Sequence, residues 1–100
     1  MIAAKYASRA DRKLARERAR EWRLFRQTYL YNQRHLASAL GCSRRTISGI
    51  ETATTIYPYA RLLARFAALK RKHEDEEAQR QHVAALREAE LYAAYHQQRA

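Results

Sequence analysis

Residues 33–51, which read QRHLASALGCSRRTISGIE, constrain the possible fold more than any other part of the chain. Gly41 can adopt the left-handed backbone conformation that commonly ends a helix, and Ser43 can cap a second helix through its hydroxyl oxygen. The apolar residues on both sides of this break recur at helical spacing: Leu36, Leu40, Ile47 and Ile50. The stretch therefore predicts two short helices joined by a tight turn, with their apolar faces turned inward.

The second of these helices would carry two arginines in its first turn. Four of its residues remain on the outer side: Arg44, Arg45, Ser48 and Gly49. Two short helices held at a wide angle can insert the second one into the major groove of DNA. The planar fork of an arginine matches O6 and N7 of guanine, so Arg44 and Arg45 are candidates for reading base edges.

This pattern resembles the helix-turn-helix of Cro/CI-type (XRE family) repressors, and the resemblance covers about residues 22–69. Those repressors place an arginine seven residues before the first helix of the motif, where this chain has Arg26. They pair it with an acidic residue at the end of the recognition helix, where this chain has Glu51. Pro58 falls where the family often begins its fourth helix. The resemblance implies an all-α, lambda-repressor-like bundle held in part by an Arg26–Glu51 ion pair.

The same resemblance implies roles for the residues around the turn. It places the base-contacting surface on Arg44, Arg45, Ser48 and Gly49, with no side chain available at the glycine. Gln33 is similar to the family residue that grips a DNA phosphate and braces the recognition helix. Ser43 and Thr46 are candidates for further phosphate hydrogen bonds.

The chain departs from the family pattern in three places. Thr52 and Ala53 stand where a glycine often follows the acidic residue, which affects the geometry of the next loop. Residues 70–77, KRKHEDEE, replace the usual short fifth helix, and the segment before Arg26 is longer than a minimal repressor needs. The last two departures affect the surface through which such a protein would dimerise.

The long N-terminal segment has no Gly or Pro between residue 4 and about residue 30, so it predicts one helix. We treat residues 1–21 as a basic helical extension of the core. A broken apolar face is expected from Tyr6, Ala10, Leu14, Trp22, Phe25 and Tyr29, and Leu30 is expected to pack beside it. A row of basic side chains, which we call the N-terminal basic row, comprises Arg9, Lys13, Arg16, Arg20 and Arg23. This row could follow a DNA backbone or simply face solvent.

Positive charge is concentrated in the first two thirds of the chain, whose net charge is +10 overall. Residues 1–26 have nine basic and three acidic side chains, and residues 27–69 have five and one. Residues 70–100 have six of each. A polyanionic partner is therefore expected for residues 1–69, with nucleic acid before an anionic membrane surface.

Residues 70–100 continue the helix that Pro58 begins, because no stop signal follows it. Pairs four residues apart favour an exposed helix: Lys70/Glu74, Arg71/Asp75 and Lys72/Glu76. Further along, one face becomes apolar through Val83, Leu86, Ala89 and Tyr92. We expect this face to make a helix–helix contact, either between two chains or back onto Leu14 of the N-terminal helix.

Several classes of protein are not expected from this sequence. The four histidines and single cysteine, Cys42, have no metal-ligand spacing, and no phosphate-binding glycine loop or nucleophile elbow is present. No enzyme, metal site or cofactor is therefore expected. No segment has the pattern of a secretory signal or a membrane span, and one cysteine fits a reducing cytoplasm.

The sequence favours a small, sequence-specific DNA-binding transcription regulator, expected to be a repressor acting on double-stranded DNA as a homodimer. One alternative is the antitoxin of a toxin–antitoxin pair, with residues 70–100 holding a partner protein. Another is a basic helical RNA-binding or membrane-surface protein that uses the N-terminal basic row.

Overall fold

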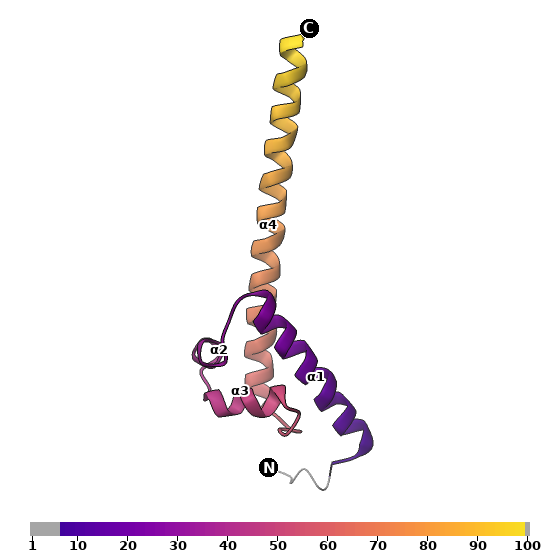
Figure 1. Cartoon of the computed structure of the whole chain (residues 1–100), viewed down its shortest axis with the longest axis vertical. Helices are drawn as coiled ribbons and strands as arrows, with labels where there is room; N and C mark the ends of the chain where they lie inside the picture. Colours follow the sequence, from indigo (N-terminus) through magenta and orange to yellow (C-terminus); the bar gives the residue numbers. More distant parts are fainter. Residues whose placement is uncertain (1–6, 100) are drawn as a thin grey trace. The chain divides into compact units, whose positions relative to one another are not determined.

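A computed structural model describes residues 7–99 as four α-helices (Figure 1). They are α1, Arg9–Thr28; α2, Gln33–Leu40; α3, Arg44–Glu51; and α4, Ala60–Arg99. No strand occurs within residues 7–99, so the all-α class is confirmed for that range. The chain divides into two compact units, and the boundary between them falls between Leu69 and Lys70.

The helix α1 begins later than the sequence predicts. Ser8 is its N-cap: the Ser8 hydroxyl accepts a hydrogen bond from the Asp11 backbone N–H at 3.0 Å. The Asp11 carboxylate accepts one in return from the Ser8 backbone N–H at 3.3 Å. This reciprocal capping box satisfies two N–H groups at the helix start, which explains why α1 begins at Arg9. Residues 4–6, where we expected the helix to begin, lie outside the described residues.

The buried face of α1 also differs from the expected one. Ala10 is exposed and Leu14 is 54% exposed, whereas Ala15 and Ala19 are buried with Trp22 and Phe25. Counting back from Trp22 in steps of three and four leads to Ala19 and Ala15. The prediction was wrong because it placed the larger Leu14 on the buried face. The structure has alanines there instead, whose small side chains allow closer packing than a leucine would. No boundary interrupts α1 between residues 21 and 22.

The α2–turn–α3 segment, residues 33–51, has the predicted local structure. Asn32 caps α2 by accepting a hydrogen bond from the His35 backbone N–H at 2.7 Å. Gly41 ends α2 with φ = 68°, and Cys42 N–H then returns to the Ala37 carbonyl at 3.0 Å. Ser43 caps α3 by accepting a hydrogen bond from Thr46 N–H at 3.2 Å.

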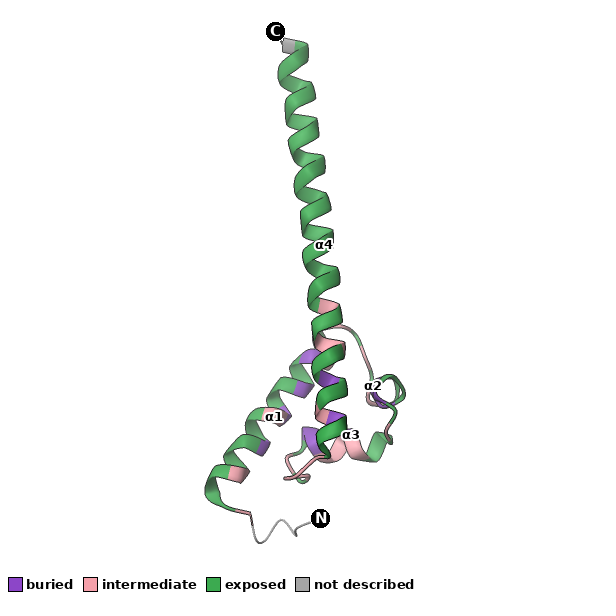
Figure 2. Ribbon diagram, turned by 180° about the vertical axis from the view of Figure 1, so that it is seen from behind, coloured by how far each residue is buried: buried purple, intermediate pink, exposed green. Residues whose placement is uncertain are grey.

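One core joins α1, the α2–turn–α3 segment and the first turns of α4, as the buried positions in Figure 2 indicate. Its members are Trp22, Phe25, Leu36, Ala37, Leu40, Ile47, Ile50, Leu62 and Phe66. The Trp22 and Phe66 rings stack with centroids 4.1 Å apart, and Phe25 meets Phe66 edge-on at 5.0 Å. These aromatic contacts fix α1 against α4, and the aliphatic residues of the α2–turn–α3 segment complete the core.

Within residues 7–99, two residues other than glycine have left-handed backbone conformations, both just after a helix. Leu30 follows α1 with φ = 60°, and Ala53 follows α3 with φ = 59°. Leu30 is 89% exposed, so the expectation that it packs on the core is wrong. Leu30 lies in the turn between α1 and α2, and its side chain faces solvent.

The start of α4 lies two residues beyond the predicted one. Pro58 precedes the helix, and the Tyr59 carbonyl accepts the first bonds from Leu62 and Leu63 N–H at 3.0 and 3.1 Å. From there α4 continues without a break to Arg99, as predicted from the absence of a stop signal.

The second unit, from Lys70 onward, is a single helix with mostly exposed side chains. Its larger apolar residues include Val83, Leu86, Leu91, Tyr92 and Tyr95, which are between 39% and 71% exposed. Over the described residues, the expected pairs Arg71/Asp75 and Lys72/Glu76 do not form. This helix therefore presents both charged and apolar side chains to solvent.

Candidate functional site

The outer surface of α3 consists of the four residues that the sequence assigned to base contact. Arg44 and Arg45 are exposed in the first turn, while Ser48 and Gly49 are half-buried one turn later. On the opposite side of the helix, Ile47 and Ile50 are 0% and 1% exposed. This division fixes which face of α3 is available to a partner, since the helix cannot rotate without exposing both isoleucines.

The end of α3 is held by an ion pair between Arg26 and Glu51, the two residues that we expected to pair. Arg26 Nη2 lies 2.8 Å from Glu51 Oε1, and Nε lies 3.0 and 3.1 Å from the two carboxylate oxygens. The Glu51 side chain is 3% exposed and that of Arg26 is 23% exposed. A buried carboxylate with several charge-assisted hydrogen bonds orients both partners strongly. The pair therefore sets the angle of α3 against α1.

At the start of α3, polar side chains brace one another. Arg44 Nε donates to Gln33 Oε1 at 3.5 Å, a long hydrogen bond that links the first residues of α3 and α2. The Ser43 and Thr46 hydroxyls lie 2.9 Å apart and share a hydrogen bond. The hydroxyls expected to contact phosphates thus serve in the N-terminal cap of α3, where Ser43 Oγ also accepts a hydrogen bond from Thr46 N–H.

Gly49 has a structural reason to be glycine that the sequence did not reveal. A Cβ at this position would collide with Oγ1 of Thr55. The backbone N–H groups of Thr54 and Thr55 also donate to the Gly49 carbonyl, at 2.9 and 3.0 Å. The loop after α3 thus folds over Gly49, and the residue provides space for that loop in addition to any role towards a ligand.

The N-terminal basic row is exposed along most of its length on α1. Its last member, Arg23, donates from Nη1 to the Glu51 carbonyl at 3.1 Å. A cation at this place interacts favourably with the partial negative charge at the C-terminal end of α3. The row therefore begins at the start of α1 and reaches the end of α3, which makes one side of the first unit strongly basic.

Sequence reasoning missed two features near α3. Arg61 and Arg65, four residues apart at the start of α4, line a cavity together with the turn between α2 and α3. Arg65 Nη1 donates to the Leu40 carbonyl at 3.2 Å. The second feature is a hydrogen bond from Tyr57, in the loop before α4. Its side-chain hydroxyl donates to Asp11 Oδ2 at 2.8 Å and so ties the start of α1 to that loop. The four-residue spacing of the two arginines was a usable signal, whereas no local pattern links Asp11 to Tyr57.

Within residues 7–99, no group of three or more His, Cys, Asp or Glu side chains is arranged to hold a metal ion. None of the helices in the described part of the chain combines the length and apolar character that a membrane span needs. Comparison of the chain with protein-family models, curated proteins and solved structures finds no match.

Proposed function

We propose that the protein is a sequence-specific DNA-binding transcription regulator whose α3 enters the major groove. The observation that carries this proposal is the pair of exposed arginines, Arg44 and Arg45, in the first turn of a short helix packed rigidly from behind. An arginine on a fixed helix can meet guanine O6 and N7 with both arms. Arg44, Arg45, Ser48 and Gly49 would lie against base edges.

The surroundings of α3 support the same proposal. Gln33, Ser43 and Thr46 lie at the two helix starts nearest to Arg44, where backbone N–H groups favour phosphate oxygens. The N-terminal basic row adds exposed positive charge that would favour a polyanion without reading its sequence. Base reading by α3 and sequence-independent attraction by the row on α1 would thus come from different helices, and they can be tested separately.

Selection of binding sites from random DNA duplexes tests the proposal directly. A recurring motif is expected, and a two-fold symmetric motif would indicate that two chains bind together. Recovery of no motif, with equal retention of all duplexes, would contradict sequence-specific binding. Such a result would favour the alternative in which the basic surface binds RNA or an anionic membrane without reading sequence.

Substitution of the two α3 arginines separates base reading from backbone binding. Arg44→Ala and Arg45→Ala should each weaken binding to the selected duplex by about 1–3 kcal/mol and change binding to a scrambled duplex little. Arg87→Ala, which removes the same charge from an exposed site in the second unit, serves as the matched control. Equal losses on both duplexes would mean that Arg44 and Arg45 contact only phosphates.

A second candidate, an antitoxin that holds a partner protein, rests on the exposed apolar side chains beyond Lys70. Leu86 is 51% exposed and Tyr92 is 68% exposed on a helix with an equal number of acidic and basic residues. A neutral helix with an apolar face suits a protein partner better than DNA. Homodimerisation would use the same face, and we favour it because repressor-like proteins need two recognition helices on a palindromic site.

A further inference from the structure

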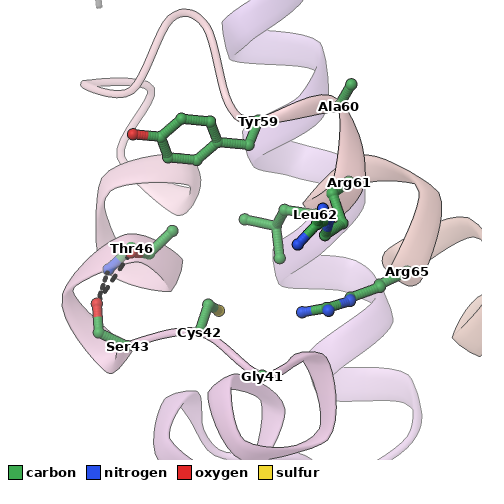
Figure 3. A pocket seen from close by; sticks show the side chains of 9 residues that line it. All are labelled: Gly41, Cys42, Ser43, Thr46, Tyr59, Ala60, Arg61, Leu62 and Arg65. Atoms are coloured by element: carbon green, nitrogen blue, oxygen red, sulfur yellow. Dashed lines mark hydrogen bonds between the residues drawn. The ribbon is translucent and has the colours of Figure 1, made fainter.

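A cavity of about 530 Å³ lies between the α2–α3 turn and the first two turns of α4 (Figure 3). Its lining is Gly41, Cys42, Ser43, Thr46, Tyr59, Ala60, Arg61, Leu62 and Arg65. The volume falls in the range of small-molecule sites, about 300–1,000 Å³. All of these residues belong to the first compact unit, so the cavity is a feature of one folded body.

The charge of the lining is entirely positive. Arg61 and Arg65 lie four residues apart on α4 and therefore on one face of the helix, and no lining residue is acidic. Over the described residues Arg61 makes no hydrogen bond or ion pair. Arg65 uses Nη1 to bind the Leu40 carbonyl and approaches within 3.0 Å of where a Cβ on Gly41 would lie. One guanidinium is thus anchored at the cavity edge while the other has its charge unmatched.

The remaining walls combine apolar groups and hydroxyls. Figure 3 shows the Tyr59 ring, the Leu62 side chain and the Cys42 thiol around the open space, with the Arg65 guanidinium beside them. Leu62 is 6% exposed and belongs to the core. Burial raises the pKa of the Cys42 thiol, although the charge of Arg65 acts in the opposite direction. At neutral pH the thiol is therefore uncharged and adds no negative charge to the cavity lining.

We propose that this cavity binds a small organic anion, with its phosphate or carboxylate group on Arg61 and Arg65 and its apolar body against Leu62 and Tyr59. Guanidinium groups bind both kinds of anion through paired, charge-assisted hydrogen bonds. The apolar walls and the volume leave room for more than a bare ion. Because Ser43 and Thr46 also belong to the start of α3, a bound anion would add negative charge beside the proposed DNA surface.

The test is a titration of the full chain with phenyl phosphate, followed by amide NMR, with inorganic phosphate and phenol as matched ligands. Phenyl phosphate should shift the amides of Cys42, Thr46 and Arg61 saturably and bind more tightly than either matched ligand. Arg61→Ala should weaken it by at least about tenfold, the usual effect of losing a charged hydrogen bond. Arg71→Ala, on the same helix in the second unit, should leave it unchanged.

Alkylation gives an independent readout, because Cys42 is the only cysteine of the chain. Bound phenyl phosphate should slow the reaction of its thiol with iodoacetamide in the parent protein and in Arg71→Ala, but not in Arg61→Ala.

Three results would overturn the proposal: no saturable shift at millimolar phenyl phosphate, equal weakening by Arg61→Ala and Arg71→Ala, or binding no tighter than that of inorganic phosphate. These measurements contain no DNA, so they stand whether or not the chain proves to bind a duplex.

Discussion

At the scale of single residues, the two partners of the Arg26–Glu51 pair differ in how deeply they are buried. Glu51 is almost fully buried, whereas Arg26 keeps nearly a quarter of its side chain in contact with solvent. Removing one partner of a buried pair is costly because the other charge is left without compensation. The two halves should therefore differ in how much stability their removal costs.

We expect Arg26→Gln to cost on the order of 3–5 kcal/mol of unfolding free energy, because it strands the buried carboxylate. Glu51→Gln should cost less, about 1–3 kcal/mol, since the amide oxygen still accepts a hydrogen bond and the guanidinium reaches water. Urea unfolding of both variants and of the double variant measures the asymmetry. Equal costs below about 1 kcal/mol, typical of surface pairs, would mean that the pair is effectively exposed.

The hydrogen bond from Tyr57 to Asp11 links the start of α1 to the loop before α4, and it predicts a pH dependence. This bond, with those from Ser8, lowers the pKa of Asp11 below its ordinary value of 3.8, and the same bond raises the pKa of Tyr57 above 10.0. A lowered carboxyl pKa stabilises the fold above the unfolded-state value, and this contribution is lost as the pH falls through the folded pKa. A raised phenol pKa stabilises below the unfolded-state value and is lost as the pH rises through the folded one.

The Tyr57 contribution should therefore be complete between about pH 4 and pH 10, the two unperturbed values. Tyr57→Phe should lower the Tm in this window, and the difference from the parent chain should shrink below about pH 4. Thermal unfolding followed by circular dichroism from about pH 2 to pH 8 spans the acid side of that window. Tyr59→Phe, at an exposed tyrosine nearby, is the control. A constant difference across the whole range would mean that the carboxylate is not the partner.

At the scale of helices, α1, α2 and α3 end in the same way, but only α2 has a glycine there. Tyr31 N–H returns to the Arg26 carbonyl at 2.9 Å, Cys42 N–H to Ala37 at 3.0 Å, and Thr54 N–H to Gly49 at 2.9 Å. Each of these bonds spans five residues and requires a left-handed residue just before the donor. Leu30, Gly41 and Ala53 occupy these places. After α3 this place is held by Ala53 and not by a glycine, so the left-handed backbone is strained there.

We expect Leu30→Gly and Ala53→Gly each to raise the stability by about 0.5–1 kcal/mol, because left-handed backbone is costly for residues with a Cβ. Leu30 is 89% exposed, so little packing is lost. Leu24→Gly is the control, because it places a glycine at a 65% exposed site inside α1, where the backbone is helical. It should cost about 1 kcal/mol. Chemical unfolding of the three variants tests the sign, and a loss of stability in both test variants would refute the strain argument.

Local sequence patterns predict some of these elements and miss others. The α2–turn–α3 segment follows from caps and spacing, because Asn32, Gly41 and Ser43 act on their own neighbours in the chain. The buried face of α1 was harder to predict from the sequence. Ala15 and Ala19 are buried because the rest of the fold packs against them, and no cap or turn next to them in the chain marks this. Gly49 belongs to the same class, because its requirement comes from Thr55 in a loop that folds back over it. The DNA contacts of this surface are still predictions.

At the scale of the whole molecule, charge and apolar exposure are divided between the two compact units. The excess positive charge lies in residues 1–69, while residues 70–100 are neutral overall. In the second unit, Val83, Leu86 and Tyr92 are 39%, 51% and 68% exposed on a single helix. Apolar side chains gathered on an exposed helix favour association with another apolar surface. The division suggests that the first unit binds the polyanion and the second binds protein.

Truncation after Leu69 tests this division. The shortened chain keeps the core residues and the Arg26–Glu51 pair, so it should fold. In light scattering we expect it to be monomeric and the full chain to be dimeric. Its affinity for a palindromic duplex should fall steeply because the two recognition helices are no longer linked, while its affinity for a single half-site should stay close to that of the full chain. In the full chain, Leu86→Glu should reproduce the loss of the dimer, and Gln81→Glu, at an exposed polar site on the same helix, is the control. A truncated chain that still dimerised and bound the palindrome at full strength would assign residues 70–100 to a different protein partner.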